Sequence, residues 1–313
     1  MNITVILCTY NRAGSLSKAL DSVARSELPK SVEWEVLVVD NNSRDQTREV
    51  VKEFCCRYPG RFRYLFEAQQ GKSYALNAGV REARGDILAF MDDDVTVEPT
   101  WLGNLTTPLH DSEWAGSGGR IVLERPLSLP RWLEVAGPYS LGGALVLFDR
   151  GDKPCELDWA PYGTNMAFRR VMFEKYGGFR TDLGPPPKIR GEDTEFGRRL
   201  MLAGERLRYE PLAIVHHPVP EDRLQKAYFL AWYFDFGRAL AREGRRGREI
   251  WGMPRPYFDI VKTGTTSLAK LSLRWMLALR PQQRFFYKVL VWREAGKIVE
   301  MYRLAGCTMK RNE

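Results

Sequence analysis

Residues 87–94 read Ile-Leu-Ala-Phe-Met-Asp-Asp-Asp, so a short apolar run leads directly into three carboxylates. A continuous apolar run of this length is typical of a strand buried in a parallel sheet. In open α/β sheets, ligands bind beyond the carboxyl ends of the strands. Adjacent carboxylates repel one another, and a hard divalent cation with oxygen ligands removes that repulsion. The segment predicts a parallel sheet with a cation site at its edge; an acidic turn that caps the next helix is the alternative.

Strand-like and helix-like segments alternate through the first hundred residues. The expected strands are 3–8, 35–39, 63–66 and 86–91, and the expected helices between them are 15–25, 45–58 and 71–83. Strands that alternate with helices at this spacing favour βαβ units. The fold class predicted from this order is α/β, with a mostly parallel sheet flanked by helices.

Beyond residue 99 the alternation weakens. We expect strands at 118–123, 144–148 and 212–215, a turn followed by a strand or helix at 163–170, an irregular Pro-rich loop at 180–190, and helices at 192–203, 224–243, 267–279 and 283–304. Long irregular loops are usually functional or mobile. We therefore divide the chain into a catalytic domain over 1–222 and a helical region over 223–313.

The charge is distributed unevenly along the chain. The net charge is +8, yet residues 223–313 alone carry 19 Lys and Arg against 7 Asp and Glu. Trp232, Trp251, Trp275 and Trp292 lie among these cations, which favours contact with an acceptor or with an anionic membrane surface. The alternative is a set of ordinary helices whose aromatic side chains pack on the catalytic domain. The basic region matches no nucleic-acid-binding motif, so we expect no nucleic-acid partner.

Composition indicates an ordinary globular protein, since 44% of residues are hydrophobic and 27% charged. The five cysteines form no Cys-x-x-Cys pair, which favours a reducing compartment. The first residues lack the features of a signal peptide, and no apolar stretch is long enough to span a bilayer. We expect a cytoplasmic protein, or one at the inner face of the plasma membrane.

Polar side chains follow each of the first four expected strands. Thr9 and Asn11 follow the first, Asp40 the second, Glu67 the third and the carboxylates 92–94 the fourth. With later motifs, this ordered set resembles the family 2 inverting glycosyltransferases of the GT-A fold over roughly residues 3–218. The resemblance is carried by Cys-Thr-Tyr-Asn-Arg at 8–12, Val-Val-Asp-Asn-Asn-Ser at 38–43, Gly71 with Asn-Ala-Gly at 77–79, Asp-Asp-Asp at 92–94, Gly-Glu-Asp at 191–193, and His216.

The resemblance implies a Rossmann-like GT-A domain with a basic helical C-terminal extension. It implies transfer of one sugar from a nucleotide-diphospho-sugar donor to a hydroxyl acceptor, such as a lipid-linked glycan or a polysaccharide, with Mn2+ or Mg2+ as cofactor. The Gln-x-x-Arg-Trp signature of processive relatives does not occur, so we expect a non-processive, hexosyltransferase-type enzyme.

The same resemblance assigns roles to individual donor-site residues. Asp40 resembles the carboxylate that reads the nucleotide base, aided by Thr9, Tyr10, Asn11 and Arg12. Asp92 resembles a ribose or metal contact and Asp94 a direct metal ligand, while Asp93 could share either task. His216 resembles a ligand of the metal or the diphosphate, with His217 as the alternative. The further donor-binding candidates are Asn42, Glu67, Lys72, Asn77, Asn165 and Arg199.

A carboxylate must accept the proton of the acceptor hydroxyl as that weak nucleophile attacks the sugar. Asp193 is the candidate base, with Glu192 beside it, because the pair begins a helix after the Pro-rich loop. The alternative is that both acids merely complement the helix dipole.

Two other functions compete with transfer. A sugar-phosphate nucleotidyltransferase would place a Gly-rich, basic phosphate loop after the first strand, and the residues 9–12 match that poorly. A non-catalytic membrane-associated scaffold would be expected to lose its carboxylates, yet Asp40, Asp92, Asp94 and Asp193 are all present.

Overall fold

The computed structural model describes residues 2–183, 191–243, 249–250, 253–254 and 262–312, and most of the loop expected at 180–190 lies outside them. The chain forms two compact units. The first comprises Met1–Pro126, Val146–Pro185 and Glu192–Pro218, and the second Leu127–Leu145, Pro186–Gly191 and Val219–Glu313. The sequence placed the division after residue 222 and did not anticipate that residues 127–145 join the second unit.

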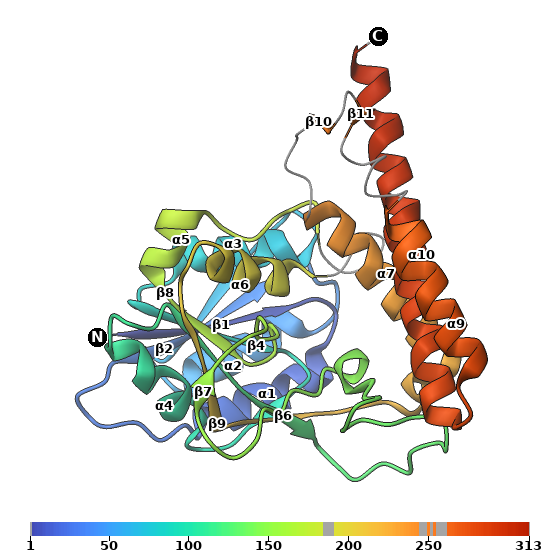
Figure 1. Cartoon of the computed structure of the whole chain (residues 1–313). Coiled ribbons are helices and arrows are strands. Elements are labelled where there is room, and N and C mark those ends of the chain that lie inside the picture. Colours follow the sequence, from blue (N-terminus) through green and yellow to red (C-terminus); the bar gives the residue numbers. More distant parts are fainter. Residues whose placement is uncertain (1, 184–190, 244–248, 251–252, 255–261, 313) are drawn as a thin grey trace. The chain divides into compact units, whose positions relative to one another are not determined.

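The first unit is built on one nine-stranded sheet (Figure 1). Its strands are β1 (Ile3–Thr9), β2 (Trp34–Asp40), β3 (Phe62–Phe66), β4 (Ile87–Asp92), β5 (Thr96–Val97), β6 (Gly116–Leu123), β7 (Cys155–Glu156), β8 (Met166–Arg169) and β9 (Leu207–His217). The order is β3-β2-β1-β4-β8-β6-β9-β5, with β7 paired to β9. β3, β2, β1 and β4 are mutually parallel, whereas β8 is antiparallel to both of its neighbours. The predicted α/β class is confirmed.

Helices cover both faces of this sheet. They are α1 (Ala13–Ala24), α2 (Thr47–Arg57), α3 (Lys72–Glu82), α4 (Trp101–Thr106) with the 3-10 turn η1 (Thr107–His110), α5 (Arg170–Tyr176) and α6 (Glu192–Leu202). Side chains alternate along β1, so Val5 and Leu7 pack in one apolar cluster with α1, α2 and α4. Ile6 packs in the other cluster, with α3, α5 and α6. This two-faced burial fixes the strand register and aligns the strand ends.

One predicted strand is absent. Residues 144–148 were expected to be extended, but η2 (Gly142–Leu145) is a 3-10 turn and Phe148 makes only an isolated bridge to Ile121. Val146 adopts a φ of 63°, a left-handed conformation that interrupts an extended chain. The turn-then-strand alternative at 163–170 is the observed one, because β8 begins at Met166.

The second unit is largely helical. It contains η2, the 3-10 turn η3 (Glu221–Leu224), α7 (Lys226–Glu243), the short strands β10 (Glu249–Ile250) and β11 (Met253–Pro254), the π-helix η4 (Thr263–Leu268), α9 (Ala269–Leu277) and α10 (Pro281–Asn312). The predicted helical extension is therefore present. Among the described residues, no helix combines the length and apolarity needed to cross a bilayer.

Two glycines allow α7 and α10 to cross closely. A Cβ at Gly237 would lie 1.8 Å from the carbonyl oxygen of Arg293, and a Cβ at Gly296 would lie 2.0 Å from that of Phe234. Backbone atoms cannot move aside as a flexible side chain does, so the helices would have to separate. The contact thus requires glycine on both helices.

Replacing Gly296 by valine is therefore expected to lower the free energy of unfolding by about 3 kcal/mol, the upper range for overpacking. Urea unfolding followed by circular dichroism measures the loss. Gly264→Ala is the matched control: a Cβ there meets no atom within 4 Å, and alanine is the better helix former. Equal stability of Gly296→Val and the unmodified protein would contradict the close crossing.

Candidate active site

The sheet register brings the predicted strand-end residues to one edge. Thr9 lies opposite Asp40, and Cys8 lies opposite Asp92. Because β1, β2 and β4 run parallel, the polar groups that follow them share the carboxyl edge of the sheet. The candidate site is built there, from the turns after these strands and the start of α6.

Asp92 is held by a cation and a hydroxyl. Lys72 Nζ lies 2.7 Å from its Oδ1, and Thr164 Oγ1 donates to its Oδ2 over 2.6 Å. Burial alone would raise the pKa of Asp92, but Lys72 and Thr164 lower it to about 2. Asp92 is therefore ionised at neutral pH. Thr164 was not predicted as a site residue, because its contact joins positions 72 residues apart.

Asp93 and Asp94 share one arginine. Arg12 Nη1 lies 3.1 Å from Asp93 Oδ1 and 2.5 Å from Asp94 Oδ2. Asp93 is 6% exposed, and burial raises its pKa to about 6 although Arg12 and the hydroxyl of Thr9 oppose the rise. Negative charge at this edge thus exceeds what the neighbouring cations neutralise.

Asp193 lies in the first turn of α6, close to the same cluster. The backbone N–H of Gly163 donates to Asp193 Oδ2 over 2.6 Å, and that of Thr194 donates to Oδ1 over 2.8 Å. A Cβ on Gly163 would lie 2.9 Å from Asp193 Oδ2, so glycine permits the close approach. The charge of Asp193 helps to raise the pKa of Lys72, although burial opposes that rise.

Glu192 precedes this aspartate and is buried. Its Oε1 lies 3.9 Å from Lys72 Nζ. Lys72 therefore joins two acids of α6 to Asp92 at the end of β4, through its short contact to Asp92 and its charge interactions with Glu192 and Asp193. The structure thus brings the predicted base, its neighbour and the acidic segment together.

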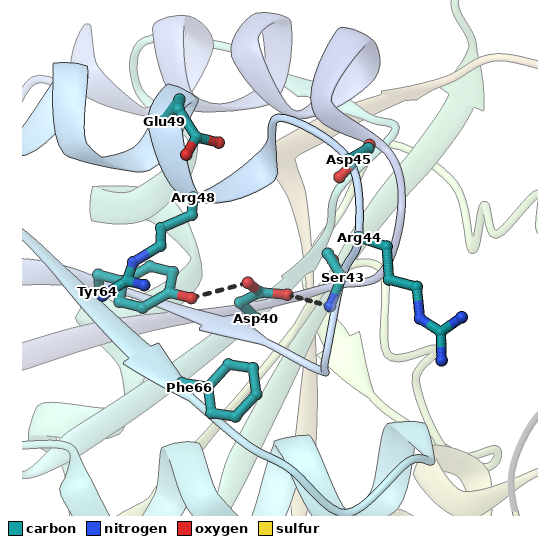
Figure 2. A pocket seen from close by; sticks show the side chains of 8 residues that line it. All are labelled: Asp40, Ser43, Arg44, Asp45, Arg48, Glu49, Tyr64 and Phe66. Carbon is teal, nitrogen blue, oxygen red and sulfur yellow. Dashed lines mark hydrogen bonds between the residues drawn. The ribbon is translucent and has the colours of Figure 1, made fainter.

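A cavity of about 420 Å³ opens beside Asp40 (Figure 2). Tyr64 donates its hydroxyl to Asp40 Oδ2 over 2.8 Å, and the backbone N–H of Ser43 donates to Oδ1 over 2.9 Å. Burial and the bond to Asp40 raise the pKa of Tyr64 to about 12. Phe66 is half exposed in the same wall. The remaining lining residues are Arg44, Asp45, Arg48 and Glu49.

Only Asp40 of this cavity was predicted. Tyr64 and Phe66 lie two apart on β3, so their side chains project from the same face of the sheet. That spacing, in the strand next to Asp40, was the available signal.

The turns after β1 and β2 brace each other. The backbone N–H of Asn11 donates to Ser43 Oγ over 3.0 Å, and its Oδ1 accepts from the N–H of Arg44 over 2.7 Å. Asn11 and Asn42 have φ angles of 52° and 66°, which asparagine tolerates better than most residues. Tyr10 lies exposed in the first turn. Asn11 and Asn42 thus shape the rim of the site through their backbones.

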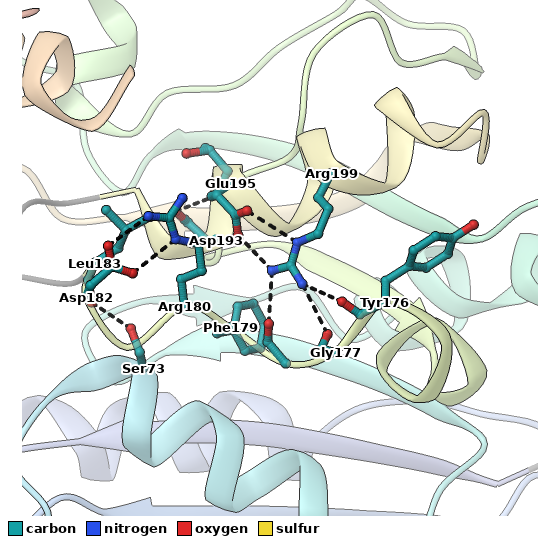
Figure 3. Close-up of polar contacts among 12 residues, drawn as sticks. Ser73, Tyr176, Gly177, Phe179, Arg180, Asp182, Leu183, Asp193, Glu195 and Arg199 are labelled. Atoms are coloured by element: carbon teal, nitrogen blue, oxygen red, sulfur yellow. Dashed lines mark hydrogen bonds and ion pairs between the residues drawn. The ribbon is translucent and has the colours of Figure 1, made fainter. Parts of the chain in front are cut away.

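Arg199, a predicted donor contact, bonds to the turn after α5. Arg199 donates hydrogen bonds to Glu195 and to the carbonyls of Tyr176, Gly177 and Gly178 (Figure 3). These bonds hold the turn after α5 against α6, and the predicted contact of Arg199 with a diphosphate stays a prediction.

Asparagine side chains hold the surrounding segments. Asn77 donates to the carbonyl of Phe179 and accepts from its N–H, both over 2.8 Å. Asn165 is fully buried and bonds Trp101 and the carbonyls of two neighbouring strands. The predicted donor contacts of Asn77 and Asn165 stay predictions. Asn41, which was not predicted, accepts from the N–H of Gly71 at the start of α3.

Glu67 also has internal partners. Its Oε1 accepts from the N–H of Gln69 over 2.8 Å, and its Oε2 lies 3.8 Å from Arg81. The carboxylate shapes the turn between β3 and α3. Its backbone N–H donates to the carbonyl of Asp40 over 2.9 Å, and its predicted donor contact stays a prediction.

The two histidines of β9 face opposite sides of the sheet, since they are consecutive on one strand. His216 Nε2 lies 2.6 Å from Glu98 Oε1. His217 is buried, and its charge contributes to the low pKa of Asp92. The predicted metal or diphosphate contact of His216, with His217 as the alternative, stays a prediction.

The carboxylates at the end of β4 are of the type that binds a divalent cation. Carboxylate oxygens are the ligands that Mg2+ and Mn2+ prefer, and Asp93 and Asp94 share one arginine, Arg12. Among the residues that the structure describes, no group of three or more His, Cys, Asp or Glu side chains is arranged around a metal position. Lys72 and Arg12 instead supply the nearby positive charge.

Comparison with known proteins adds independent evidence. The model of the glycosyl transferase family 2 matches residues 4–177. The succinoglycan biosynthesis protein ExoM of Rhizobium meliloti (strain 1021) is 29% identical over 258 residues, which cover 81% of this chain and 80% of that protein. The glucosyl-dolichyl phosphate glucuronosyltransferase of Haloferax volcanii is 27% identical over 233 residues, which cover 72% of each chain.

A solved structure shares the fold. It is the mannosyltransferase PcManGT from Pyrobaculum calidifontis in complex with GDP-Man and Mn2+, with a TM-score of 0.63 and 20% identity, and the match covers 96% of this chain and 87% of the other. At that identity the likeness concerns the fold alone, and it confirms the predicted GT-A architecture. The family model matches more than half of the chain. The chain therefore belongs to the family 2 glycosyltransferases.

Proposed function

We propose that this enzyme is an inverting, metal-dependent glycosyltransferase that adds one sugar per reaction from a nucleotide-diphospho-sugar to a hydroxyl acceptor. The observation that carries the proposal is the meeting of Asp92, Glu192 and Asp193 around Lys72 at the sheet edge. This arrangement supports a donor phosphate site beside a carboxylate base.

Asp193 is the proposed general base. Each of its oxygens accepts one backbone N–H bond, which fixes the carboxylate and leaves further lone pairs. In the proposed reaction, Asp193 takes the acceptor proton while the hydroxyl oxygen attacks the anomeric carbon and the nucleoside diphosphate departs. Direct displacement of this kind inverts the anomeric configuration and needs no second carboxylate as nucleophile.

Asp92 and Asp94 would hold the divalent cation, and Asp93 would share the role of either one. The cation, when bound, supplies positive charge that stabilises the departing diphosphate. His217 is the proposed histidine of this region in place of His216, because His217 is buried and His216 Nε2 lies 2.6 Å from Glu98 Oε1. The mannosyltransferase PcManGT is in complex with Mn2+, which supports Mn2+ as the ion to test first and Mg2+ as the second.

The cavity beside Asp40 is the proposed pocket for the nucleotide base of the donor. Tyr64 and Ser43 orient the carboxylate of Asp40, which can accept an N–H of the base, while Phe66 offers an aromatic surface for its ring. Thr9, Tyr10 and Asn11 contribute the adjoining turn. Arg12 is a proposed diphosphate contact, since it already lies beside Asp94.

The proposed acceptor is a lipid-linked glycan or a polysaccharide. Support comes from the names of two relatives, one in succinoglycan biosynthesis and one acting on glucosyl-dolichyl phosphate. A nucleotidyltransferase is the second candidate, but no specific observation favours it.

A donor-hydrolysis screen tests the proposed function. The protein is incubated with UDP-, GDP- and dTDP-sugars in the presence of Mn2+, Mg2+ or EDTA, and released nucleoside diphosphate is quantified. We expect one donor to be cleaved with a metal and not with EDTA. Release of sugar phosphate and a nucleoside monophosphate, or no cleavage of any donor with any metal, would contradict the proposal.

Asp40→Asn is expected to weaken binding of the preferred nucleoside diphosphate by roughly 10- to 100-fold, the range for losing a hydrogen bond to a charged group. Isothermal titration with UDP, GDP and dTDP measures the effect. Glu49→Gln, from the wall of the same cavity, is the control and should bind almost normally. Unchanged binding by Asp40→Asn would place the nucleotide base elsewhere, and equal loss in both variants would show that Asp40 has no specific role in binding it.

A further inference from the structure

Large apolar side chains are exposed where α9 turns into α10. Met276 is 70% exposed, Leu277 68% and Leu279 95%, and Leu273 is half exposed one turn earlier. Spacings of three and four residues place Leu273, Met276 and Leu277 on one face of α9. We call the exposed apolar side chains at residues 273, 276, 277 and 279 the α9 tip. Clustered exposed apolar residues of this kind usually mark an interaction surface.

The charged residues near the α9 tip along the chain are all positive. Residues 260–293 contain seven Lys and Arg and no Asp or Glu. Lys270, Arg274, Arg280 and Arg284 are all exposed. Aliphatic side chains thus alternate with positive charges over this stretch. The pattern suits a partner with an apolar interior and an anionic surface.

Aromatic side chains extend the same character onto α10. Lys288 Nζ lies 5.7 Å from the ring centre of Trp275 and 5.4 Å from that of Trp292. Trp292 is also exposed. Tryptophan beside lysine is favoured at the depth of lipid headgroups, where the ring has an apolar body and a polar edge.

We propose that the α9 tip docks on an anionic phospholipid bilayer. Leu273, Met276, Leu277 and Leu279 enter between the acyl chains, and the neighbouring arginines and lysines contact lipid phosphates. No described helix is suited to cross the bilayer, so the contact is interfacial. Charge complementarity selects the occupant: an acyl layer faced by phosphate groups matches both the apolar and the cationic side chains.

This inference specifies a partner of the enzyme beyond the proposed transfer reaction. A membrane-docked enzyme would meet a lipid-linked acceptor at the bilayer surface. Vesicle binding needs neither donor nor turnover, so the docking surface and the transfer reaction can fail separately.

Vesicle flotation of the full-length protein tests the docking surface. The protein is mixed with vesicles of phosphatidylcholine alone or with added phosphatidylglycerol, and the bound fraction is measured. We expect binding only with phosphatidylglycerol. The combined change Leu273→Gln, Met276→Gln, Leu277→Gln and Leu279→Gln should reduce the partition coefficient by at least about tenfold, because buried apolar area drives insertion.

The electrostatic component has its own variant. Arg274→Gln with Arg280→Gln should weaken vesicle binding roughly fivefold per charge. Added salt should also weaken vesicle binding by the unmodified protein. Arg150→Gln with Arg206→Gln is the charge-matched control and should leave binding unchanged. Arg150 is an exposed arginine of the first unit and Arg206 a partly exposed one.

Leu202→Gln with Leu212→Gln is the control for apolar side chains, since both leucines are exposed in the first unit. Circular dichroism checks that every variant is folded. Normal flotation of the folded α9-tip variant would overturn the proposal. So would absence of vesicle binding together with a monomer–dimer change of that variant in sedimentation velocity, because the surface would then join two copies of the chain.

Discussion

Asp193→Asn should lower donor turnover by about 10²- to 10⁴-fold, the usual contribution of general base catalysis. The amide keeps the size of the side chain and one oxygen acceptor, but it cannot take a proton from the nucleophile. The N–H of Gly163 and of Thr194 bond opposite oxygens of this carboxylate, so the amide must present its NH2 group to one of them. We therefore expect a strong loss of kcat with a modest cost in stability.

Steady-state kinetics of donor hydrolysis, with water as the acceptor, measure this effect. The donor KM should stay within a fewfold of the unmodified value, because Asp193 acts on the nucleophile. Asp158→Asn, an exposed carboxylate of the same unit, controls for a general effect of charge. Turnover of Asp193→Asn close to that of the control would exclude Asp193 as the base.

Lys72→Met should destabilise the protein and weaken donor binding together. The change leaves Asp92 and Glu192 without the cation that lies 2.7 Å and 3.9 Å from them. Breaking a fully buried ion pair costs about 3–5 kcal/mol, and the 29% exposure of the Lys72 side chain reduces the expected loss to roughly 1–3 kcal/mol.

This loss should depend on pH in a defined direction. In the unmodified protein the pKa of Asp92 lies near 2, below its unfolded value, so this carboxylate stabilises the fold above about pH 4 and loses that effect as pH falls. Without Lys72, burial dominates and raises the pKa of Asp92. The stability difference between variant and unmodified protein should therefore be largest near pH 7 and shrink toward pH 4.

Urea unfolding at several pH values measures that difference. Lys175→Met is the control, because Lys175 is exposed and pairs with Glu205 at the surface; its loss should stay below about 1 kcal/mol. A pH-independent difference for Lys72→Met would show that its ion pair with Asp92 does not stabilise the fold.

The sequence predicted the first half of the sheet well, because its signal is local. Each of β1, β2 and β4 is composed mostly of apolar residues and ends at a polar residue, and burial on both faces favours that pattern. The antiparallel part was harder to predict. Val146 adopts a backbone conformation that apolar composition does not reveal.

Individual site residues followed the same division. The positions of Asp40 and Asp92 at one edge of the sheet were predictable, because the ends of parallel strands converge there. The scaffold roles of Asn77 and Arg199 were not, because each depends on carbonyls brought close by tertiary structure. The sequence shows the same residue type at a family position whether its polar side chain binds a ligand or stabilises a turn. Tyr64 was not predicted because its hydrogen bond to Asp40 depends on the pairing of two neighbouring strands.

Equilibrium binding tests the central claim most directly. The donor cleaved in the hydrolysis screen is titrated calorimetrically into the unmodified protein, Asp94→Ala and Asp193→Asn, with Mn2+ or with EDTA. The account predicts Mn2+-dependent binding that is lost in Asp94→Ala and kept in Asp193→Asn. Binding that is indifferent to EDTA and to Asp94→Ala would contradict a metal-assisted donor site at the end of β4.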